Sequence, residues 1–206
     1  MLEFKTENIR NIALIGHGDS GKTTLTEGML FTAKESKRFG SVDAGTTVSD
    51  YNADEIERKI SINTSVLHCT WNNNKINILD TPGYMDFTGE VIGALHAVEL
   101  GALVVNAVSG IEVGTEIVWG YCEKDNLPRI IIINKLNKEH AGFQKTLDLL
   151  KKQFSNKAIC VQFAANEGIT FDSIIDVLSM KMFKFSKDKS GKKNTWKKGI
   201  LPMKNS

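Results

Sequence analysis

Short apolar runs rich in β-branched residues alternate with longer segments of helical spacing along most of the chain. We expect strands at residues 11–15, 66–71, 76–79, 102–107 and 129–133, and helices at residues 22–33, 88–99, 112–125 and 142–153. Such alternation predicts an α/β fold with a mainly parallel β-sheet and helices on both faces. Residues 130–133 are four consecutive isoleucines without polar alternation, which predicts a strand buried on both sides.

Residues 34–65 interrupt this alternation. They lack apolar periodicity, contain Gly40 and Gly45 and carry many charges. A long irregular segment inside a compact domain is usually functional or disordered. This segment lies between a phosphate-binding motif, described next, and the following strand, where nucleotide-dependent switches carry a mobile segment. We therefore expect residues 40–65 to respond to a bound nucleotide.

A phosphate-loop pattern occupies residues 16–23, after the first predicted strand and at the start of the first predicted helix. In that context the backbone N–H groups of a glycine-rich turn and the positive end of a helix together bind phosphates. Lys22 would hold the β- and γ-phosphates, and the Thr23 hydroxyl would bind Mg²⁺. We assign nucleotide binding to His17, Gly18, Asp19, Ser20, Gly21, Lys22, Thr23 and Thr24.

Two further motifs directly follow predicted strands. Asp80-Thr81-Pro82-Gly83 begins at the end of the strand at 76–79, the sheet edge where ligands bind in open parallel sheets. Asp80 would position Mg²⁺, and the Gly83 N–H would contact the γ-phosphate. The run at 134–137 reads Asn-Lys-Leu-Asn, and P-loop GTPases use such an Asn-Lys pair to recognise guanine. Asn134 and Lys135 therefore favour guanine over adenine, and Asn137 takes the fourth position of this base-binding motif.

Together these motifs resemble the GTP-binding domain of elongation factor G. The resemblance covers residues 9–184 and includes the motifs at 16–24, 57–62, 80–87 and 134–135. It implies a P-loop NTPase fold in three layers, with GTP or GDP and Mg²⁺ as cofactors and the ribosome as partner. It also implies that Thr23, Ser61 and Asp80 hold the metal, that Asp50 lies near it, and that Lys22, Gly83 and Tyr84 occupy the catalytic positions.

Several positions depart from the pattern of that family. Tyr84 replaces the histidine that positions the attacking water, and a phenol with a pKa of about 10 is not tunable near neutral pH as imidazole is. Gly18 replaces an apolar residue beside that histidine. Asn137 replaces an aspartate, which predicts a loss of guanine affinity of roughly 1 to 3 kcal/mol and a better fit to xanthine. Lys59 for glycine and Ser61 for threonine are milder changes.

The chain divides, on this resemblance, into a G-domain core at residues 1–155 and the start of an inserted subdomain at 156–206. Residues 164–168 are then part of the insert and the last nucleotide loop lies beyond the chain, whereas in a compact GTPase they would form that loop. Residues 181–206 contain nine lysines and one aspartate, so they carry +8 while the whole chain carries +2. This segment could contact RNA, although charge runs are more often simply solvated.

The leading hypothesis is a Mg²⁺-dependent guanine-nucleotide switch that acts on the ribosome and hydrolyses GTP slowly. The alternatives are a regulatory nucleotide-binding module with little or no GTPase activity, or a truncated fragment without activity. No run of about 18 apolar residues and no signal peptide is present, so we expect a cytoplasmic protein without a membrane partner. We also expect a monomer.

Overall fold

The computed structural model describes residues 3–187 and 194–200 and forms two compact units. The first comprises Met1–Val105 and Ile111–Asn134, and the second comprises Asn106–Gly110 and Lys135–Ser206. Within the described residues, no helix combines the length and apolar character that crossing a membrane requires.

The first unit is built on a five-stranded sheet. Its strands are β1 (Ile9–Ile15), β2 (Ser65–Trp71), β3 (Asn74–Asp80), β4 (Leu100–Asn106) and β5 (Arg129–Asn134), in the spatial order β2-β3-β1-β4-β5. Strand β1 pairs in parallel with β3 and β4, whereas β2 runs antiparallel to β3. The β2–β3 hairpin turns at Asn72 and Asn73, both with positive φ, the conformation that a two-residue hairpin turn favours.

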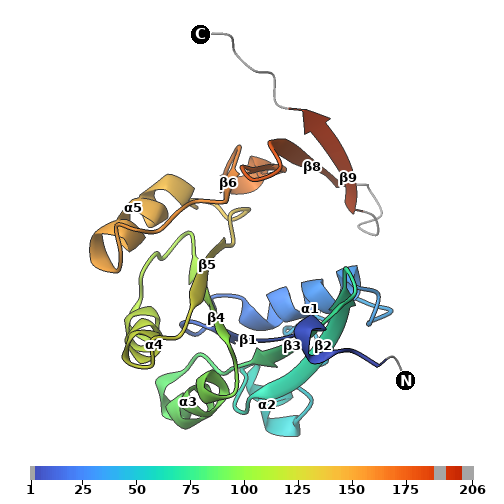
Figure 1. Ribbon diagram of the computed structural model, residues 1–206, viewed down its shortest axis with the longest axis vertical. Coiled ribbons are helices and arrows are strands. Elements are labelled where there is room, and N and C mark those ends of the chain that lie inside the picture. The colour runs from blue at the N-terminus through green and yellow to red at the C-terminus, as the bar shows by residue number, and fades with distance from the viewer. Residues whose placement is uncertain (1–2, 188–193, 201–206) are drawn as a thin grey trace. The chain divides into compact units, whose positions relative to one another are not determined.

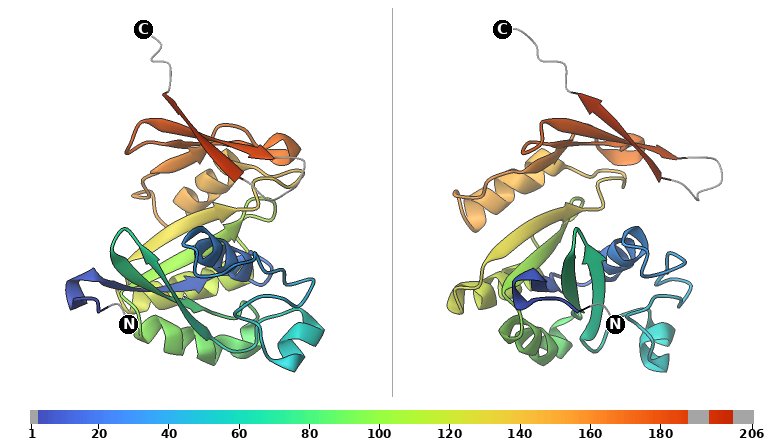
Figure 2. Two further views of the ribbon diagram at one scale, coloured as in Figure 1. Left: turned by 90° about the vertical axis from the view of Figure 1, so that its right-hand side faces the viewer. Right: turned by 45° about the vertical axis from the view of Figure 1, so that its right-hand side comes forward.

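Helices cover both faces of this sheet. Helix α1 (Lys22–Thr32) lies on one face, and α3 (Thr88–His96) and α4 (Val113–Lys124) lie on the other (Figure 1, Figure 2). Between α1 and the sheet, a cluster of buried apolar side chains forms the core: Leu14, Leu30, Cys69, Ile78, Ala102 and Val104. The predicted α/β fold with a mainly parallel sheet and helices on both faces is confirmed, and each predicted strand and helix of this unit matches an observed one.

The strand with four isoleucines differs from its prediction. Strand β5 comes last in the sheet order, and Ile130 is 48% exposed, so burial on both sides is wrong. Residues 34–65 also contain more regular structure than expected, because they include the short helix α2 (Ala53–Arg58). Two short 3₁₀ turns, η1 (Thr6–Asn8) and η2 (Met85–Phe87), complete this unit.

The second unit contains helix α5 (Phe143–Gln153) and an antiparallel sheet. Its strands are β6 (Gln162–Ala164), β7 (Ser173–Asp176), β8 (Lys181–Lys187) and β9 (Asn194–Ile200), in sequence order, with a 3₁₀ turn η3 (Gly168–Thr170) after β6. Much of the lysine-rich segment, at 188–193 and 201–206, lies outside the described residues. The boundary at residue 155 and the assignment of 156–206 to an insert stay predictions.

Helix α2 ends at a residue with a strained backbone. Its C-cap is Lys59, with φ 58° and ψ 37°, in the left-handed region that glycine adopts without steric cost. A non-glycine residue there costs about 1–2 kcal/mol. The cost is concentrated where the loop turns from α2 toward Ser61, one of the predicted metal ligands.

We therefore expect Lys59→Gly to raise the free energy of unfolding by about 1 kcal/mol and the melting temperature by about 2–4 °C. Lys59→Ala is the matched control, because it removes the same long side chain but keeps the Cβ atom that causes the strain. Thermal unfolding followed by circular dichroism measures both variants. Equal melting temperatures for the two variants would contradict this account.

Candidate functional site: a phosphate loop beside a buried oxygen cluster

The loop between β1 and α1 depends on two glycines. Gly16 has φ 144°, and a Cβ atom there would lie 2.4 Å from the carbonyl oxygen of Val104 on β4. Gly21 is the N-cap of α1 and has φ 93°. Other residues adopt these angles only with strain, so both glycines are required for the loop to fold back onto the start of α1. Its backbone thus takes the position that the sequence motif predicts.

Lys22 lies buried inside this loop, with only 6% of its surface exposed. Its Nζ donates hydrogen bonds to the carbonyl oxygens of Gly16 and His17, both at 3.0 Å. Burial lowers the pKa of Lys22 to about 8, and the negative charges of Asp80, Asp19 and Asp50 oppose that shift. An ammonium group held this way lacks the solvation that water would give it, which favours the approach of an anion such as a phosphate.

A cluster of oxygen atoms lies at the start of α1. The hydroxyl oxygens of Thr23 and Ser61 are 3.2 Å apart, although 38 residues separate them in sequence. Asp80 is 1% exposed and Asp50 is 5% exposed. Burial raises the pKa of Asp80 to about 6, against the influence of Lys22 and of the Thr23 and Ser49 hydroxyls, and burial also raises the pKa of Asp50. The structure therefore brings together Thr23, Ser61 and Asp80, the three predicted metal ligands.

Several buried oxygens of the first unit, among them those of Asp80, lack a well-formed hydrogen bond in the described part of the chain. They are both carboxylate oxygens of Asp80, Oδ2 of Asp50, and the hydroxyls of Ser20, Thr26, Thr47 and Ser49. Buried polar atoms without partners are costly, and such a group in a native protein calls for a ligand, ion or water. Hydroxyl and carboxylate oxygens are the donors that Mg²⁺ prefers. The residues present therefore fit a magnesium ion.

Ser49 is a member of this cluster that the sequence did not reveal. It is 1% exposed, and its carbonyl oxygen accepts a hydrogen bond of 2.6 Å from the hydroxyl of Ser65 at the start of β2. No motif marks a lone serine before Asp50. Only the path of the chain from α1 to β2 brings its hydroxyl close to Asp80.

Two buried carboxylates hold the segment at 40–63 in place. Glu27 on α1 is fully buried and accepts hydrogen bonds from the backbone N–H groups of Gly40 and Val48. Glu55 on α2 is 1% exposed and accepts hydrogen bonds from the N–H groups of Ile62 at 2.9 Å and Asn63 at 3.0 Å. The contacts of Glu27 tie the segment to α1, whereas those of Glu55 lie within the segment and involve the two residues directly after Ser61.

Not every residue of the phosphate-loop motif directs its side chain to the same place. The His17 ring contacts α4, where Nδ1 accepts a hydrogen bond of 3.3 Å from the N–H of Gly114 and Nε2 lies 3.6 Å from Glu112. His17 contributes to the loop through its carbonyl oxygen, which Lys22 binds. The side chains of Asp19 and Thr24 are exposed, unlike that of Thr23. The role of each in nucleotide binding stays a prediction.

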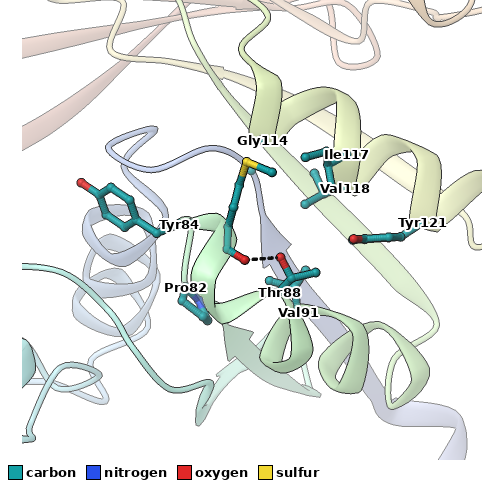
Figure 3. A pocket seen from close by; sticks show the side chains of 11 residues that line it. Pro82, Tyr84, Thr88, Val91, Gly114, Ile117, Val118 and Tyr121 are labelled. Carbon is teal, nitrogen blue, oxygen red and sulfur yellow. Dashed lines mark hydrogen bonds between the residues drawn. The ribbon is translucent and has the colours of Figure 1, made fainter.

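The loop after β3 lies against the phosphate loop. A Cβ atom at Gly83 would meet Nζ of Lys22 at 2.4 Å and the backbone nitrogen of Gly18 at 2.7 Å, so only glycine fits there. Tyr84 is 43% exposed and borders a small pocket. The ring of Tyr84 points away from Val118 and Tyr121 on the opposite wall, which α4 provides (Figure 3). Gly83 and Tyr84 thus lie beside Lys22 and Gly18, as their predicted catalytic positions require.

The residues predicted to bind guanine belong to both units. Asn134, at the end of β5, donates a hydrogen bond of 2.9 Å from its side-chain amide to the carbonyl oxygen of Ser20. This contact ties β5 to the phosphate loop. Lys135 and Asn137 belong to the second unit, so their role in base recognition stays a prediction.

The loop at 164–168 is tied to other parts of the second unit. The N–H of Gly168 donates to the carbonyl oxygen of Leu136 at 2.8 Å, and Glu167 accepts a hydrogen bond of 2.8 Å from the N–H of Phe143. A last nucleotide loop and the start of an insert are both compatible with these contacts, so both interpretations stay open.

Comparison with known proteins identifies relatives across nearly the whole chain. The family model described as the Elongation factor Tu GTP binding domain matches residues 7–192. Proteins named ribosome-releasing factor 2, mitochondrial, are similar: the one from Drosophila willistoni is 38% identical over 187 residues, which are 91% of this chain and 25% of that protein. The one from Lodderomyces elongisporus is 42% identical over 188 residues, 89% of this chain and 23% of that protein.

A solved structure shares the fold. The crystal structure of a protein from Thermus thermophilus superposes with a TM-score of 0.86 at 32% sequence identity, covering 95% of this chain and 28% of that one. The chain therefore spans about a quarter of the length of the relatives it matches.

The contacts of Glu55 lead to a stability prediction. Glu55→Gln keeps the shape of the side chain but removes its charge and places an amide N–H among backbone donors. We expect a loss of about 1.5–3 kcal/mol in the free energy of unfolding, the range for hydrogen bonds to a charged group. Urea unfolding measures the loss, and faster tryptic cleavage after the exposed Arg58 or Lys59 would report local release of the segment.

Glu57→Gln is the matched control, because Glu57 lies exposed on the same helix. It should change the free energy of unfolding by less than about 0.5 kcal/mol. If both substitutions give the same small effect, Glu55 does not hold the segment in place.

Proposed function

We propose a function that follows from the family of this chain. The chain belongs to the Elongation factor Tu GTP binding domain family. On this basis it acts as a guanine-nucleotide switch of the elongation factor G-like class. The observation that carries this proposal is the convergence of Thr23, Ser61 and Asp80 beside the phosphate loop, with buried oxygens that lack partners. Such a cluster is suited to a divalent cation between protein and phosphate oxygens.

Each residue of the site would then have its own role in binding the nucleotide. A bound Mg²⁺ would neutralise charge on the phosphate oxygens. The Thr23 and Ser61 hydroxyls and the Asp80 carboxylate would hold the ion, and Asp50 would add negative charge beside it. Lys22 would approach the β- and γ-phosphates, and the N–H groups of the loop and of Gly83 would donate to phosphate oxygens.

Switching follows from the position of Ser61. Glu27 ties its segment to α1 and Glu55 orders the turn after it, while its hydroxyl oxygen lies 3.2 Å from that of Thr23. Loss of the γ-phosphate would remove the ligand that joins Ser61 and Gly83 to one centre. Both segments would then be free to change conformation, as in other nucleotide switches.

Hydrolysis is the reaction that this arrangement supports, at a low intrinsic rate. Lys22 and the Gly83 N–H would stabilise charge on the transferred phosphoryl group. Tyr84 can hold a water molecule through its hydroxyl, but at neutral pH a phenol is a poor proton acceptor. The regulatory-module and inactive-fragment alternatives have less support, because the phosphate loop and the metal-binding oxygens are complete.

The partner and the location of the whole protein are inferred from its relatives. The relatives are named as mitochondrial ribosome-releasing factors. We infer the ribosome as the partner of the protein to which this G domain belongs. The monomeric state, the cytoplasmic location and an RNA contact by the lysine-rich segment stay predictions. Residues 156–206 are best interpreted as the start of an insert, since β6 to β9 form their own antiparallel sheet.

A titration of the 206-residue chain with fluorescent GDP and a non-hydrolysable GTP analogue tests the proposed site. With Mg²⁺ we expect saturable binding that unlabelled GTP displaces and ATP displaces weakly, and with EDTA we expect much weaker binding. Phosphate release, measured with and without ribosomes, then tests turnover. Absence of guanine-nucleotide binding by a chain that unfolds cooperatively would overturn the proposed function.

Ser61→Ala should weaken Mg²⁺-dependent binding of the GTP analogue by roughly tenfold, since one hydroxyl ligand is lost, and should leave GDP binding nearly unchanged. Ser61→Thr should restore binding, because it keeps the hydroxyl. Ser41→Ala removes an exposed hydroxyl from the same segment and serves as the control. If Ser41→Ala and Ser61→Ala behave alike in the magnesium titration, Ser61 is not a ligand.

Asn137→Asp tests base recognition. A carboxylate accepts two hydrogen bonds from the guanine edge, so we expect GDP to bind roughly 10- to 100-fold more tightly and xanthine nucleotide to bind more weakly. Competition between GDP and XDP for the fluorescent nucleotide measures the change. Asn126→Asp, at a turn after α4, makes the same chemical change elsewhere and should alter neither affinity. An unchanged preference in Asn137→Asp would contradict the assignment of Asn137 to the base.

A further inference from the structure

The ring of Tyr84 lies directly against the backbone of Gly18. A Cβ atom at Gly18 would be 3.1 Å from Cζ of Tyr84 and 3.3 Å from each of Cε1 and Cε2. These three ring atoms are its nearest neighbours, and distances this short are below ordinary van der Waals contact. Gly18 is buried, while Tyr84 is 43% exposed. The ring therefore covers Gly18 with one side and meets solvent with another.

The backbone conformation of Gly18 does not itself require glycine. Gly18 is absent from the residues with positive φ, unlike Gly16 and Gly21 on either side of it. A side chain at this position would be free of the strain that a left-handed conformation imposes. The three atoms nearest to such a side chain all belong to the Tyr84 ring, so the two positions are sterically linked although they lie far apart in sequence.

The link is fixed in place by the residue before Tyr84. Gly83 packs so closely on Gly18 and Lys22 that no side chain fits there, which sets the start of the Tyr84 side chain over the loop. Directly after Tyr84, the 3₁₀ turn η2 continues into α3. There the Thr88 hydroxyl donates a hydrogen bond of 2.6 Å to the Met85 carbonyl oxygen (Figure 3). The backbone at Tyr84 is thus set between the closely packed Gly83 and the start of a helix.

We propose that Gly18 and Tyr84 form a matched pair in which the tyrosine ring is a lid on the phosphate loop. This proposal deepens the proposed function and rests on it for its consequence. An aromatic ring over the peptide at residue 18 keeps water from one side of the loop, which strengthens hydrogen bonds from loop N–H groups to bound phosphates. Tyr84 is therefore a positioning residue whose ring, independently of its hydroxyl, retains the nucleotide.

A double-mutant cycle on the full chain tests the pair. The four proteins are the parent, Gly18→Val, Tyr84→Ala and the double variant, and the measurement is the dissociation rate of fluorescent GDP in Mg²⁺. Each single substitution should speed dissociation roughly tenfold, because each removes the ring from the loop. The double variant should be no faster than either single variant, since valine then occupies space that the ring has left.

Two further variants separate the ring from other effects. Tyr84→Phe keeps the ring and removes the hydroxyl, so its dissociation rate should equal that of the parent. Gly120→Ala adds a methyl group to an exposed glycine of α4 with open space around it, and should leave the dissociation rate of GDP unchanged. Gly18→Ala replaces Gly18→Val if the larger side chain prevents folding, because a methyl group requires the ring to move by only a few tenths of an ångström.

Melting temperatures of the same four proteins without nucleotide give a second cycle that does not depend on the proposed function. Valine at position 18 should lower the melting temperature when Tyr84 is present and much less when alanine replaces it. Equal effects of Gly18→Val in both backgrounds would overturn the matched pair. Coupling in the melting temperatures without coupling in nucleotide dissociation would overturn the lid, and failure of the parent to bind nucleotide would instead overturn the proposed function.

Discussion

The burial of charged groups at the start of α1 is the constraint on which the rest of the first unit depends. Lys22, Asp50 and Asp80 are all nearly inaccessible to solvent. Burial lowers the pKa of Lys22 and raises the pKa values of Asp50 and Asp80, so it favours the neutral form of each group. The mutual attraction of these groups offsets only part of the cost of removing them from water. Oxygens without partners around them leave the remainder uncompensated until a cation and an anion arrive together. The cost of burying these charges therefore favours the joint binding of a cation and an anion.

The scaffold around these charges is correspondingly rigid where it must be. Gly16 passes so close to the Val104 carbonyl oxygen that β1 and β4 fix the first turn of the phosphate loop. Asn134 at the end of β5 binds Ser20, so three neighbouring strands position a single loop. On the other side, Glu27 and Glu55 direct their carboxylates to backbone N–H groups of one long segment. The segment is therefore tied to α1 through Glu27, to β2 through the hydrogen bond from Ser65 to the Ser49 carbonyl oxygen, and to Thr23 through Ser61.

The sequence predicted the parts that rest on contiguous patterns. Strands, helices and the phosphate loop follow from local periodicity and spacing, and Asp80 follows from its place at the end of a strand. The prediction that the four isoleucines are buried on both sides was wrong, because β5 lies at the end of the sheet. That position depends on the strand order, which chain order does not reveal. Helix α2 does carry a local signal: Glu55 accepts a hydrogen bond from the backbone of Asn52, its N-cap, as Asn followed by Glu three residues later often does.

Side chains that act across long sequence separations could not be predicted in this way. Ser49 and Glu27 are single residues without a motif, and only the folded path of residues 34–65 gives them partners. The contact between Gly18 and Tyr84 likewise could not be predicted from the sequence. Each is a separate departure from the family pattern, and each taken alone suggests a weakened site. Their contact changes that interpretation, because the Tyr84 ring occupies the space that a side chain at residue 18 would need.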